Sequence, residues 1–386
     1  MIHYDRVWAE IDLDAIIKNM ESIKSRIDKN VQVVAVIKTD GYGHGAAQIA
    51  RVLEPDEQVW GYAVATAEEA FSLREHAIRK PILILGYTFP YSYEKLIDED
   101  VRMAVFMDDV AQMLSDKAVE MSKVCKVHVK VDTGMTRIGI RPDAEGIAFV
   151  DRLSKLPGIE IEGIFTHFAT ADEKDRSKTR KQYEDFCDFT EKIESELKLH
   201  IPMKHCANSA SIVEMPQMHM DAVRAGIILY GLWPSASVQK DHQIDLYPVL
   251  SLKTRVVYVK TVPAGQEISY GGTFTTSRDT RVATVCIGYG DGYPRSLSNI
   301  GYVLIKGQKA KILGRVCMDQ FMIDVTDIQG EICVGDVVTL IGRDGDQTIT
   351  MEELGELSGR FNYELACDLG KRIPRIYKID DTLINE

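Results

Sequence analysis

Residues 33–45 read Val-Val-Ala-Val-Ile-Lys-Thr-Asp-Gly-Tyr-Gly-His-Gly. The apolar residues 33–37 have high β propensity, which is typical of a strand buried on both faces in a parallel sheet. Lys38 ends this run, and a glycine-rich turn follows it. Burial lowers the pKa of a lysine amine and makes it usable as a nucleophile or a Schiff-base amine. A lysine with a buried stem and an amine that reaches solvent explains this segment equally well.

The rest of the first 235 residues alternates strand-like and helix-like patterns. The strand candidates are 31–38, 59–65, 81–86, 101–106, 125–132, 159–168, 203–208 and 222–231. Helical patterns between them include Ala67–His76, Asp109–Lys123 and Lys178–Leu199. Eight strands separated by helices predict a (β/α)8 TIM-type barrel of the α/β class. An open doubly wound sheet would need about two fewer strands and a dinucleotide fingerprint, which is absent.

From about residue 245 the pattern changes to short β-rich runs divided by Gly and Asp turns. These runs are Leu252–Val262, Thr280–Ile287, Ala310–Val325 and Asp336–Ile341, and one late helix is predicted near Phe361–Lys371. Asp344 begins a segment that resembles a calcium loop, but Ile349 and Gly355 replace the required Gly and Glu, so we predict a turn. The sequence therefore predicts a barrel over 1–240 and a mostly β domain over 241–386.

Composition excludes several classes of protein. The chain has 386 residues, of which 45% are hydrophobic, and a net charge of −12. That charge argues against a nucleic-acid partner or an acidic membrane surface, which need clustered Lys and Arg. No run approaches the ~20 apolar residues that span a bilayer, and the N-terminal residues lack the apolar core of a signal peptide. The seven dispersed cysteines and nine histidines show no metal-ligand spacing, so we expect a cytoplasmic protein without a metal.

Unusual polar residues recur at the predicted carboxyl ends of the barrel strands, where the active sites of such barrels lie. They are Lys38, Lys130, Asp132, His167, Asn208 and Ser209. Arg224 interrupts the apolar run 222–231 and needs a buried partner, because its charge cannot be discarded. The backbone N–H groups of Gly226 and Ile227 next to it are candidates to bind an anion.

A series of short motifs in chain order resembles one known family. The motifs are residues 38–45, 130–139, 166–172, 207–210, 223–227, 268–271, 288–292, 314–320 and 362–364. They span nearly the whole chain and are similar to those of the bacterial alanine racemases, which use pyridoxal 5′-phosphate (PLP) on a barrel followed by a β domain. The first motif departs from the family's usual Ala-Asn-Ala, having Thr39-Asp40-Gly41 instead.

The resemblance implies a role for each matching residue. Lys38 would hold PLP and act as the base on one face of the substrate α-carbon, and Tyr270 of a second subunit would be the base on the other face. Two bases on opposite faces are what inversion requires. A tyrosine needs cationic or hydrogen-bonding neighbours to act as a base near neutral pH, and in the family His167, linked to Arg224, provides them. Arg224 would face the PLP pyridine nitrogen, where a carboxylate is usual.

The remaining assignments also follow from the resemblance. PLP would contact Tyr42, Asn208, Ser209, Gly226, Ile227 and Tyr363. The substrate would contact Arg137, Met318, Tyr289 and Asp319, and the access corridor would include Asp172, Tyr289, Arg295 and Arg315. Lys130 would be N-carbamylated and brace Arg137. Simpler interpretations remain for Tyr289 as packing, for Ser209 as a helix N-cap and for Asp319 as support for Tyr270 or the interface.

The sequence therefore predicts a homodimeric, PLP-dependent alanine racemase that supplies D-alanine for peptidoglycan. A serine racemase or a racemase of broader amino-acid specificity is the first alternative, although serine-preferring relatives tend to carry a smaller polar residue where this chain has Tyr363. A non-catalytic PLP-binding homeostasis protein is the second, and such relatives lack the domain that carries Tyr270.

Overall fold

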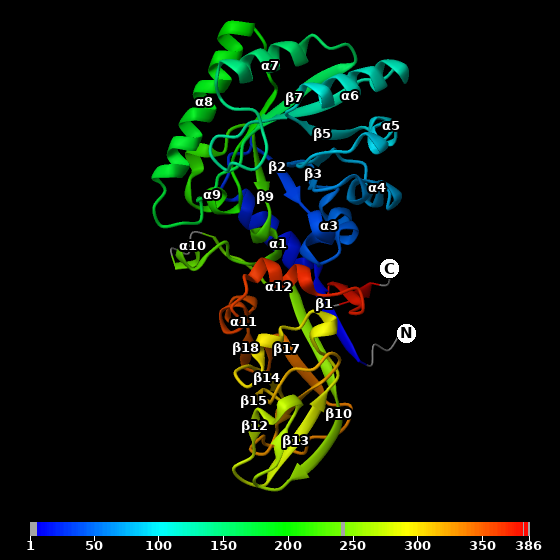
Figure 1. Cartoon of the computed structure of the whole chain (residues 1–386), viewed down its shortest axis with the longest axis vertical. Coiled ribbons are helices and arrows are strands. Elements are labelled where there is room, and N and C mark those ends of the chain that lie inside the picture. The colour runs from blue at the N-terminus through cyan, green and yellow to red at the C-terminus, as the bar shows by residue number, and fades with distance from the viewer. Residues whose placement is uncertain (1–5, 241–243, 381, 385–386) are drawn as a thin grey trace.

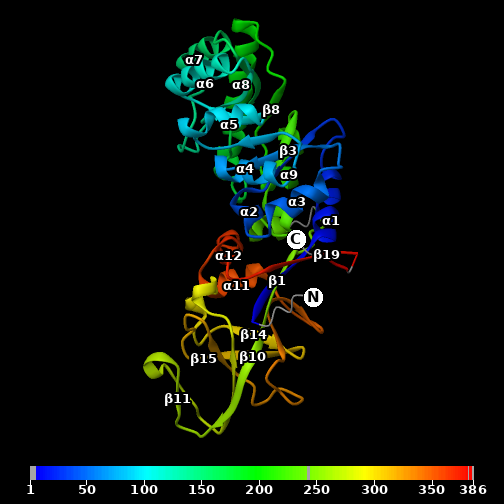
Figure 2. The same cartoon turned by 90° about the vertical axis from the view of Figure 1, so that its right-hand side faces the viewer.

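The chain folds into two lobes along one axis, as seen in the computed structural model of Figures 1 and 2. The structure describes residues 6–240, 244–380 and 382–384. Strands ringed by helices form one lobe, and a lobe rich in β-strands forms the other. Strand β10 (Leu250–Val262) runs from the junction far into the second lobe. Among the described residues, no helix is both long and apolar enough to cross a membrane.

The first lobe is a closed barrel of eight parallel strands. They are β2 (Gln32–Val36), β3 (Val59–Val64), β4 (Ile82–Ile84), β5 (Val101–Val105), β6 (Cys125–Lys130), β7 (Ile159–Phe165), β8 (Met203–His205) and β9 (Ala222–Ala225). Each strand pairs with the next, and β9 pairs with β2 to close the ring. The predicted TIM-type barrel is therefore confirmed. The last predicted strand, 222–231, is wrong beyond residue 225, because the 3-10 helix η3 (Ile227–Tyr230) follows β9 there. The run is buried on all sides, so its apolar residues show no periodicity that would separate a strand from a helix.

Helices connect the barrel strands. They are α2 (Lys38–Tyr42), α3 (Ala46–Leu53), α4 (Ala67–Glu75), α5 (Tyr93–Asp98), α6 (Asp108–Glu120), α7 (Ala144–Ser154), α8 (Ser177–Leu197) and α9 (Ser209–Glu214). Helix α7 illustrates how the sequence forms them. Asp143 caps its first turn by accepting hydrogen bonds from two backbone N–H groups. Phe149, Val150 and Leu153 then form the buried stripe that packs on the barrel.

The second lobe is built on one large sheet, which confirms the mostly β domain. Its order is β18-β17-β14-β15-β16-β13-β10-β1-β19-β20. The new members are β1 (Val7–Asp12), β13 (Thr280–Val285), β14 (Tyr302–Ile305), β15 (Gln308–Leu313), β16 (Phe321–Asp324), β17 (Val337–Asp344), β18 (Gln347–Ile349), β19 (Arg375–Ile379) and β20 (Thr382–Ile384). Strands β11 (Glu267–Ile268) and β12 (Phe274–Thr275) pair separately. The β17–β18 hairpin confirms the predicted turn after Asp344.

Two helices and one loop of this lobe differ from the sequence pattern. The late helix is α12 (Asn362–Asp368), and α11 (Met351–Ser358) before it was not predicted. The predicted run Ala310–Val325 is two strands, β15 and β16, joined by a loop over 314–320. Gly314 has a φ of 73° there, so the chain leaves the extended conformation that its apolar neighbours favour.

Strand β1 lies in the range 1–240 that the sequence assigned to the barrel, yet it belongs to the sheet of the second lobe. It pairs antiparallel with β10 and parallel with β19. Ala9 and Ile11 are fully buried there, so pairing in the sheet removes their apolar surface from water. The predicted boundary after residue 240 adjoins residues 241–243, which lie outside the described residues.

The carboxylate of Glu10 joins three neighbouring strands of this sheet, β10, β1 and β19, and we expect its loss to weaken the fold in a pH-dependent way. Burial alone would raise the pKa of Glu10, but hydrogen bonds from Lys378, Trp8 and Lys253 lower it to about 2. A lowered carboxyl pKa contributes stability above the unfolded-state value of 4.5, and that contribution is lost as the pH falls toward 2. Glu10→Gln should therefore lower the free energy of unfolding by ~1–3 kcal/mol at pH 7.

Urea denaturation of both proteins between pH 7 and pH 3 measures this effect. The difference between them should shrink below pH 4.5. A difference that is independent of pH would mean that the ionised carboxylate is not what joins the strands.

Candidate active site at the barrel mouth

A cavity of about 740 Å³ lies at the carboxyl ends of the barrel strands. Its lining includes Lys38, Tyr42, Lys130, Arg137, His167, Asp172, Asn208, Ser209, Arg224, Gly226, Ile227 and Tyr363. Tyr363 comes from α12, and the others come from the barrel lobe. The structure therefore brings together, at one cavity, every residue to which the sequence resemblance gave a contact with the cofactor.

One end of the cavity offers hydrogen-bond donors to an anion. The backbone N–H of Gly226 donates to Oγ of Ser209 at 3.0 Å. A Cβ at Gly226 would lie 3.2 Å from Oη of Tyr42 and 3.4 Å from Oγ of Ser209, so glycine leaves room for both hydroxyls beside this N–H. Burial raises the pKa of Tyr42, which keeps its hydroxyl a donor. Such a cluster of donors suits a phosphate group.

The neighbouring residue Asn208 has a structural task. It is the N-cap of α9, and its side chain accepts a hydrogen bond from the backbone N–H of Ser211 at 3.2 Å. The simpler interpretation of Ser209 as the N-cap is therefore wrong. Ser209 is the first residue of α9, and its hydroxyl is directed to Gly226 instead.

A left-handed turn carries Lys38 into the cavity. Thr39, Asp40, Gly41 and Tyr42 have φ values of 54°, 50°, 61° and 52°. Such a conformation costs ~1–2 kcal/mol for each residue that is not glycine, so neighbouring groups must hold it. Glu69 accepts from the N–H of Thr39 at 2.5 Å, and Asp40 accepts from the N–H of Ala46 at 2.9 Å. Thr39-Asp40-Gly41, which replaces the family's usual Ala-Asn-Ala, therefore stabilises this turn in two ways. The Asp40 side chain accepts a hydrogen bond across the turn, and Gly41 adopts the left-handed conformation without strain.

The amine of Lys38 is prepared for chemistry by its surroundings. Burial lowers the pKa of Lys38, and the charge of Arg137 lowers it further. The amine lies 6.0 Å from the centre of the Tyr42 ring. A larger fraction of neutral amine is therefore present near neutral pH than for an exposed lysine, which favours both Schiff-base formation and proton abstraction.

Gly43 anchors the same turn, and we expect Gly43→Ala to weaken both the fold and the site. Its φ is 78°, and an added Cβ would meet the carbonyl oxygen of Ala366 at 2.2 Å. Arg375 also donates to the Gly43 carbonyl at 3.0 Å, so the backbone cannot easily move away. The combined strain and clash should cost ~2–4 kcal/mol of unfolding free energy.

The matched control for this change is Gly265→Ala. Gly265 has a φ of 80°, but no atom lies within 4 Å of the position that an added Cβ would take, so it isolates the cost of the backbone conformation. Urea denaturation should show the larger loss for Gly43→Ala. Equal losses for the two variants would contradict the packing of this turn against α12.

Arg224 is buried at the cavity wall and donates hydrogen bonds to several surrounding groups. Its guanidinium donates to the backbone carbonyls of Thr166, His205 and Cys206 at 2.7, 3.0 and 2.9 Å. It also donates to Nδ1 of His205 at 2.9 Å and to Nδ1 of His167 at 3.3 Å. Burial lowers the pKa of Arg224 to about 10, which still leaves it charged at neutral pH.

His167 is held neutral by the same surroundings. Burial and the Arg224 charge keep its pKa well below the ordinary value. Because Nδ1 accepts from Arg224, a neutral His167 carries its proton on Nε2 and can donate there.

Lys130 is a second buried lysine at the cavity. Its amine donates to the carbonyl of Val131 at 2.6 Å. Burial, and then the charge of Arg224, lower the pKa of Lys130 to about 8. Arg137 lines the same cavity. A neutral amine near neutral pH is the form that reacts with carbon dioxide, so this environment is compatible with the carbamylation expected from the resemblance.

Apart from Tyr363, the predicted residues of the second lobe do not line this cavity in their own chain. Tyr270 is 70% exposed at the start of η4 (Tyr270–Gly272), and Met318 and Tyr289 are 52% and 42% exposed. The loops of Tyr289 and Met318 are joined by the hydrogen bond from the N–H of Gly290 to the Met318 carbonyl at 2.8 Å. Asp319 pairs with Arg372 at 2.7 Å. The corridor candidates Arg295 and Arg315 also belong to this lobe.

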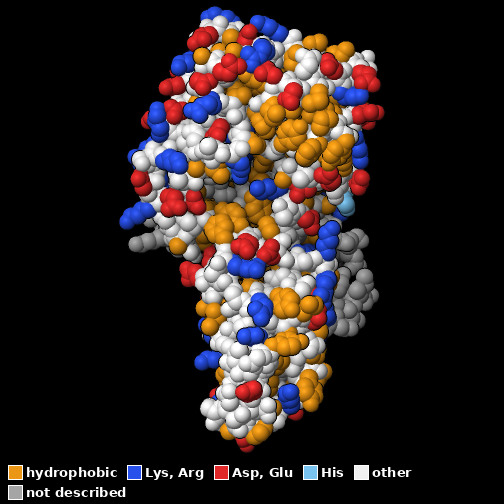
Figure 3. Space-filling view, in the orientation of Figure 1, with side chains coloured by type: hydrophobic (Ala, Val, Ile, Leu, Met, Phe, Trp, Pro, Cys, Tyr) orange, Lys and Arg blue, Asp and Glu red, His pale blue; other side chains and the backbone are white. Residues whose placement is uncertain are grey.

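Apolar surface lies on the barrel lobe beside the cavity. Figure 3 shows a gathering of hydrophobic side chains on one side of this lobe. Tyr87, Phe89 and Tyr91 of the barrel lobe are exposed, their rings lie against one another in sequence, and Tyr87 also lines the cavity. An exposed apolar patch of this kind marks an interaction surface.

Three polar residues connected to Arg224, two of them fully buried, were missed from the sequence. His205 contacts Arg224 directly, and His128 and Glu162 extend the contact across the barrel. Each lies inside a predicted barrel strand, so a polar residue at an inward strand position was the available signal.

The fold and the site define an enzyme whose barrel mouth holds a partly desolvated lysine beside a cluster of hydroxyl groups and a backbone N–H. Two family models match the chain: "Alanine racemase, N-terminal domain" over residues 11–234 and "Alanine racemase, C-terminal domain" over residues 249–377. The chain therefore belongs to the alanine racemase family, and it is an isomerase.

Individual relatives agree over the full length. The alanine racemase of Clostridium tetani is 44% identical over 383 residues, which cover 99% of this chain and 98% of that protein. The structure of an alanine racemase from Clostridium difficile 630 is 39% identical with a TM-score of 0.94, covering 100% of this chain and 98% of the other. The alanine racemase of Bacillus anthracis with bound L-Ala-P is 38% identical with a TM-score of 0.93 at the same coverage.

Proposed function

We propose that this chain interconverts L- and D-alanine with PLP held by Lys38, using Lys38 and the Tyr270 of a second copy as the two bases. The observation that carries the proposal is the amine of Lys38 in the cavity, with a buried guanidinium at Arg224 and an anion cradle at Gly226. Among the described residues, the tyrosines that line the cavity are Tyr42, Tyr87 and Tyr363, so Tyr270 of the same chain is not one of them. The exposed Tyr270 is free to supply the second base to a partner.

The residues present fit PLP. The phosphate would be held by the hydroxyls of Tyr42 and Ser209 and by the N–H groups of Gly226 and Ile227. These donors lie at one end of the cavity, in space that a Cβ at Gly226 would partly fill. Tyr363 would complete this end, since it lines the cavity with its ring 6.0 Å from that of Tyr42. When bound, PLP supplies an electron-accepting ring for the charge that develops on the substrate α-carbon.

Arg224 would meet the ring nitrogen. A guanidinium donates hydrogen bonds and does not give up its proton, so it leaves that nitrogen unprotonated. Arg224 would thereby leave the ring a weaker electron acceptor than a carboxylate partner would, which would favour prompt return of the proton to the α-carbon. The five acceptors around Arg224 fix the direction in which it donates.

Proton transfer is assigned to two residues. The amine of Lys38 would take or return the proton on one face of the α-carbon, and the partner's Tyr270 would do so on the other. His167 would donate from Nε2 to the Tyr270 oxygen and stabilise it, because its Nδ1 is already occupied by Arg224. Arg137 would hold the substrate carboxylate with Met318 of the partner, and a carbamylated Lys130 would brace Arg137. Tyr289 and Asp319 of the partner would border the substrate.

The proposed assembly is a homodimer with shared sites. Tyr270, Met318 and Tyr289 are exposed on one lobe, while the cavity that they would complete lies on the other. The exposed apolar surface around Tyr87 would be buried in the interface with a second copy. We further propose that residues 1–240, apart from β1, act as the cofactor domain and that residues 241–386 act as the domain that completes the partner's site. We also propose that the D-alanine serves peptidoglycan synthesis.

Serine is the competing substrate. Tyr363 narrows the cavity next to Tyr42 and stacks on Phe361 at 4.4 Å, which favours the smaller alanine side chain. A pocket separates substrates that differ by one small group by ~1–3 kcal/mol, so slow turnover of serine is expected as well.

Proton NMR of L-alanine in D2O, combined with chiral analysis, tests the proposed reaction. Loss of the α-proton signal with simultaneous appearance of D-alanine is expected. PLP binding without exchange of the α-proton of either alanine or serine would instead support a non-catalytic PLP-binding protein.

A further inference from the structure

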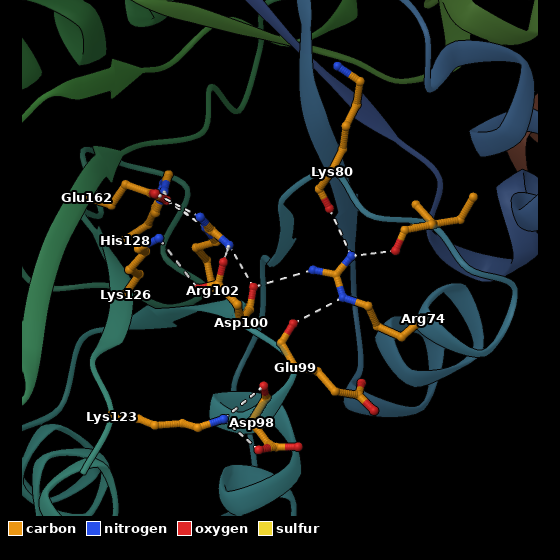
Figure 4. A network of polar contacts seen from close by, with 11 residues as sticks. Arg74, Lys80, Asp98, Glu99, Asp100, Arg102, Lys123, Lys126, His128 and Glu162 are labelled. Atoms are coloured by element: carbon orange, nitrogen blue, oxygen red, sulfur yellow. Dashed lines mark hydrogen bonds and ion pairs between the residues drawn. The ribbon is translucent and has the colours of Figure 1, made fainter. Parts of the chain in front are cut away.

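A line of buried polar side chains leads from Arg224 through the barrel and away from the cavity. Nη1 of Arg224 contacts Nδ1 of His205 at 2.9 Å, and Nε2 of His205 contacts Nδ1 of His128 at 3.0 Å. Nε2 of His128 then contacts Oε2 of Glu162 at 3.2 Å. Glu162 is bound in a bidentate manner by Arg102, at 2.9 and 3.0 Å. Figure 4 shows the outer end of this line, where His128, Glu162 and Arg102 point toward one another.

The two imidazoles of this line can carry their protons in only one arrangement. A guanidinium is a donor without a lone pair, so Nδ1 of His205 must accept. A neutral His205 therefore has its proton on Nε2 and donates to Nδ1 of His128. His128 must then have its own proton on Nε2, which donates to Glu162. A second proton on either ring would place two N–H groups against each other.

The charges along the line support this arrangement. Burial keeps the pKa of His205 and of His128 below the ordinary value, so both rings are neutral. Burial alone would raise the pKa of Glu162, but hydrogen bonds from His128 and Arg102 lower it to about 2. The line therefore runs from a cation at Arg224 through two neutral rings to an anion, and Arg102 is held in turn by Asp100 at 2.8 Å.

We propose that Glu162, held by Arg102, is a positioning residue for Arg224. By accepting from His128, it fixes one tautomer of His128 and, through it, one tautomer of His205. With these tautomers, Arg224 can donate to Nδ1 of His205 and keep its orientation at the cavity. This inference rests on the proposed function for its effect on catalysis, and only on the geometry for the tautomers. Hydrogen bonds in series polarise one another in a low-dielectric interior, so the carboxylate at the far end strengthens each step. Without it, a proton on Nδ1 of His205 would face the guanidinium and push it from its place.

Histidine-selective ¹⁵N NMR of the holoenzyme and of the protein without PLP tests the tautomers directly. We expect His128 and His205, assigned by single substitutions, to carry a proton on Nε2 and a lone pair on Nδ1 at pH 7. A proton on Nδ1 of either ring, or two protons on either, would overturn the proposal. This readout does not depend on racemase activity, so failure of the proposed function leaves it interpretable.

Two variants separate the charge of Glu162 from its hydrogen bond. Glu162→Met removes both, and Glu162→Gln keeps an acceptor for His128 but loses the charge. We expect Glu162→Met to populate both tautomers of His128 and to lower kcat by about tenfold with a change in KM below about twofold, as partners behind a site residue typically do. Glu162→Gln should keep the wild-type tautomers and lower kcat less.

Glu10→Met and Glu10→Gln are the matched controls. The side chain of Glu10 is 19% exposed against 18% for Glu162, its pKa is likewise lowered to about 2, and it lies in the sheet of the second lobe. Both controls should keep the ¹⁵N pattern and kcat. The proposal is contradicted if Glu162→Met keeps the wild-type tautomers and the kcat of Glu10→Met.

Discussion

Tyr270→Phe is expected to leave PLP binding intact and to lower the rate of racemisation by about 10²–10⁴-fold, the contribution of a positioned acid or base. The change removes one hydroxyl from a side chain that is 70% exposed in its own chain, so it should not disturb the fold. Removal of the α-proton from L-alanine should suffer most, because we assign the L-alanine face to Tyr270 and the D-alanine face to Lys38. Exchange of the α-proton from L-alanine and from D-alanine in D2O measures the loss on each face, and the absorption spectrum of bound PLP measures cofactor binding.

Tyr258→Phe is the matched control. Tyr258 is also an exposed tyrosine of the second lobe, on β10, and lies outside the motifs that resemble the family. It should keep the wild-type rate. Full turnover by Tyr270→Phe would contradict the assignment of two bases.

Lys38→Ala is expected to abolish the covalent attachment of PLP and to lower racemisation by about 10⁴-fold, the upper end of what a positioned acid or base contributes. The same amine is assigned both the bond to the cofactor and one of the two proton transfers, and its lowered pKa supports each task. Borohydride should fix PLP to the wild-type protein and fail to fix it to the variant.

Lys311→Ala is the control for this variant, because Lys311 is an exposed lysine on β15. It should retain both borohydride-stable PLP and activity. Attachment of PLP to Lys38→Ala after borohydride would show that another amine holds the cofactor.

The barrel was predictable from the sequence because its strands are regular. Its eight segments are short and recur in regular alternation with helical patterns, and this alternation predicts a parallel barrel even where a single strand carries polar residues. Strand β1 was not assigned to the second sheet, because its partners β10 and β19 lie more than 230 residues away. The split of 310–325 into two strands depends on a glycine turn at Gly314 that apolar periodicity does not reveal.

The site was predictable as a set of residues but not as an arrangement. The polar residues at strand ends converge because parallel strands share one edge, which is why Lys38, His167 and Arg224 meet. The left-handed turn that carries Lys38 depends on acceptors as distant as Glu69. The line through His205 and His128 depends on ring orientations that only the packed barrel fixes.

Mixing Lys38→Ala and Tyr270→Phe chains tests most directly the claim that each site is built from two copies. A mixed dimer has one site that combines an intact Lys38 with an intact Tyr270, and one site that lacks both. Random pairing should therefore restore about a quarter of the wild-type activity, since half of the dimers are mixed and each has one working site. Mixed dimers, isolated by two different affinity tags, that remain as inactive as the separate variants would contradict the shared site.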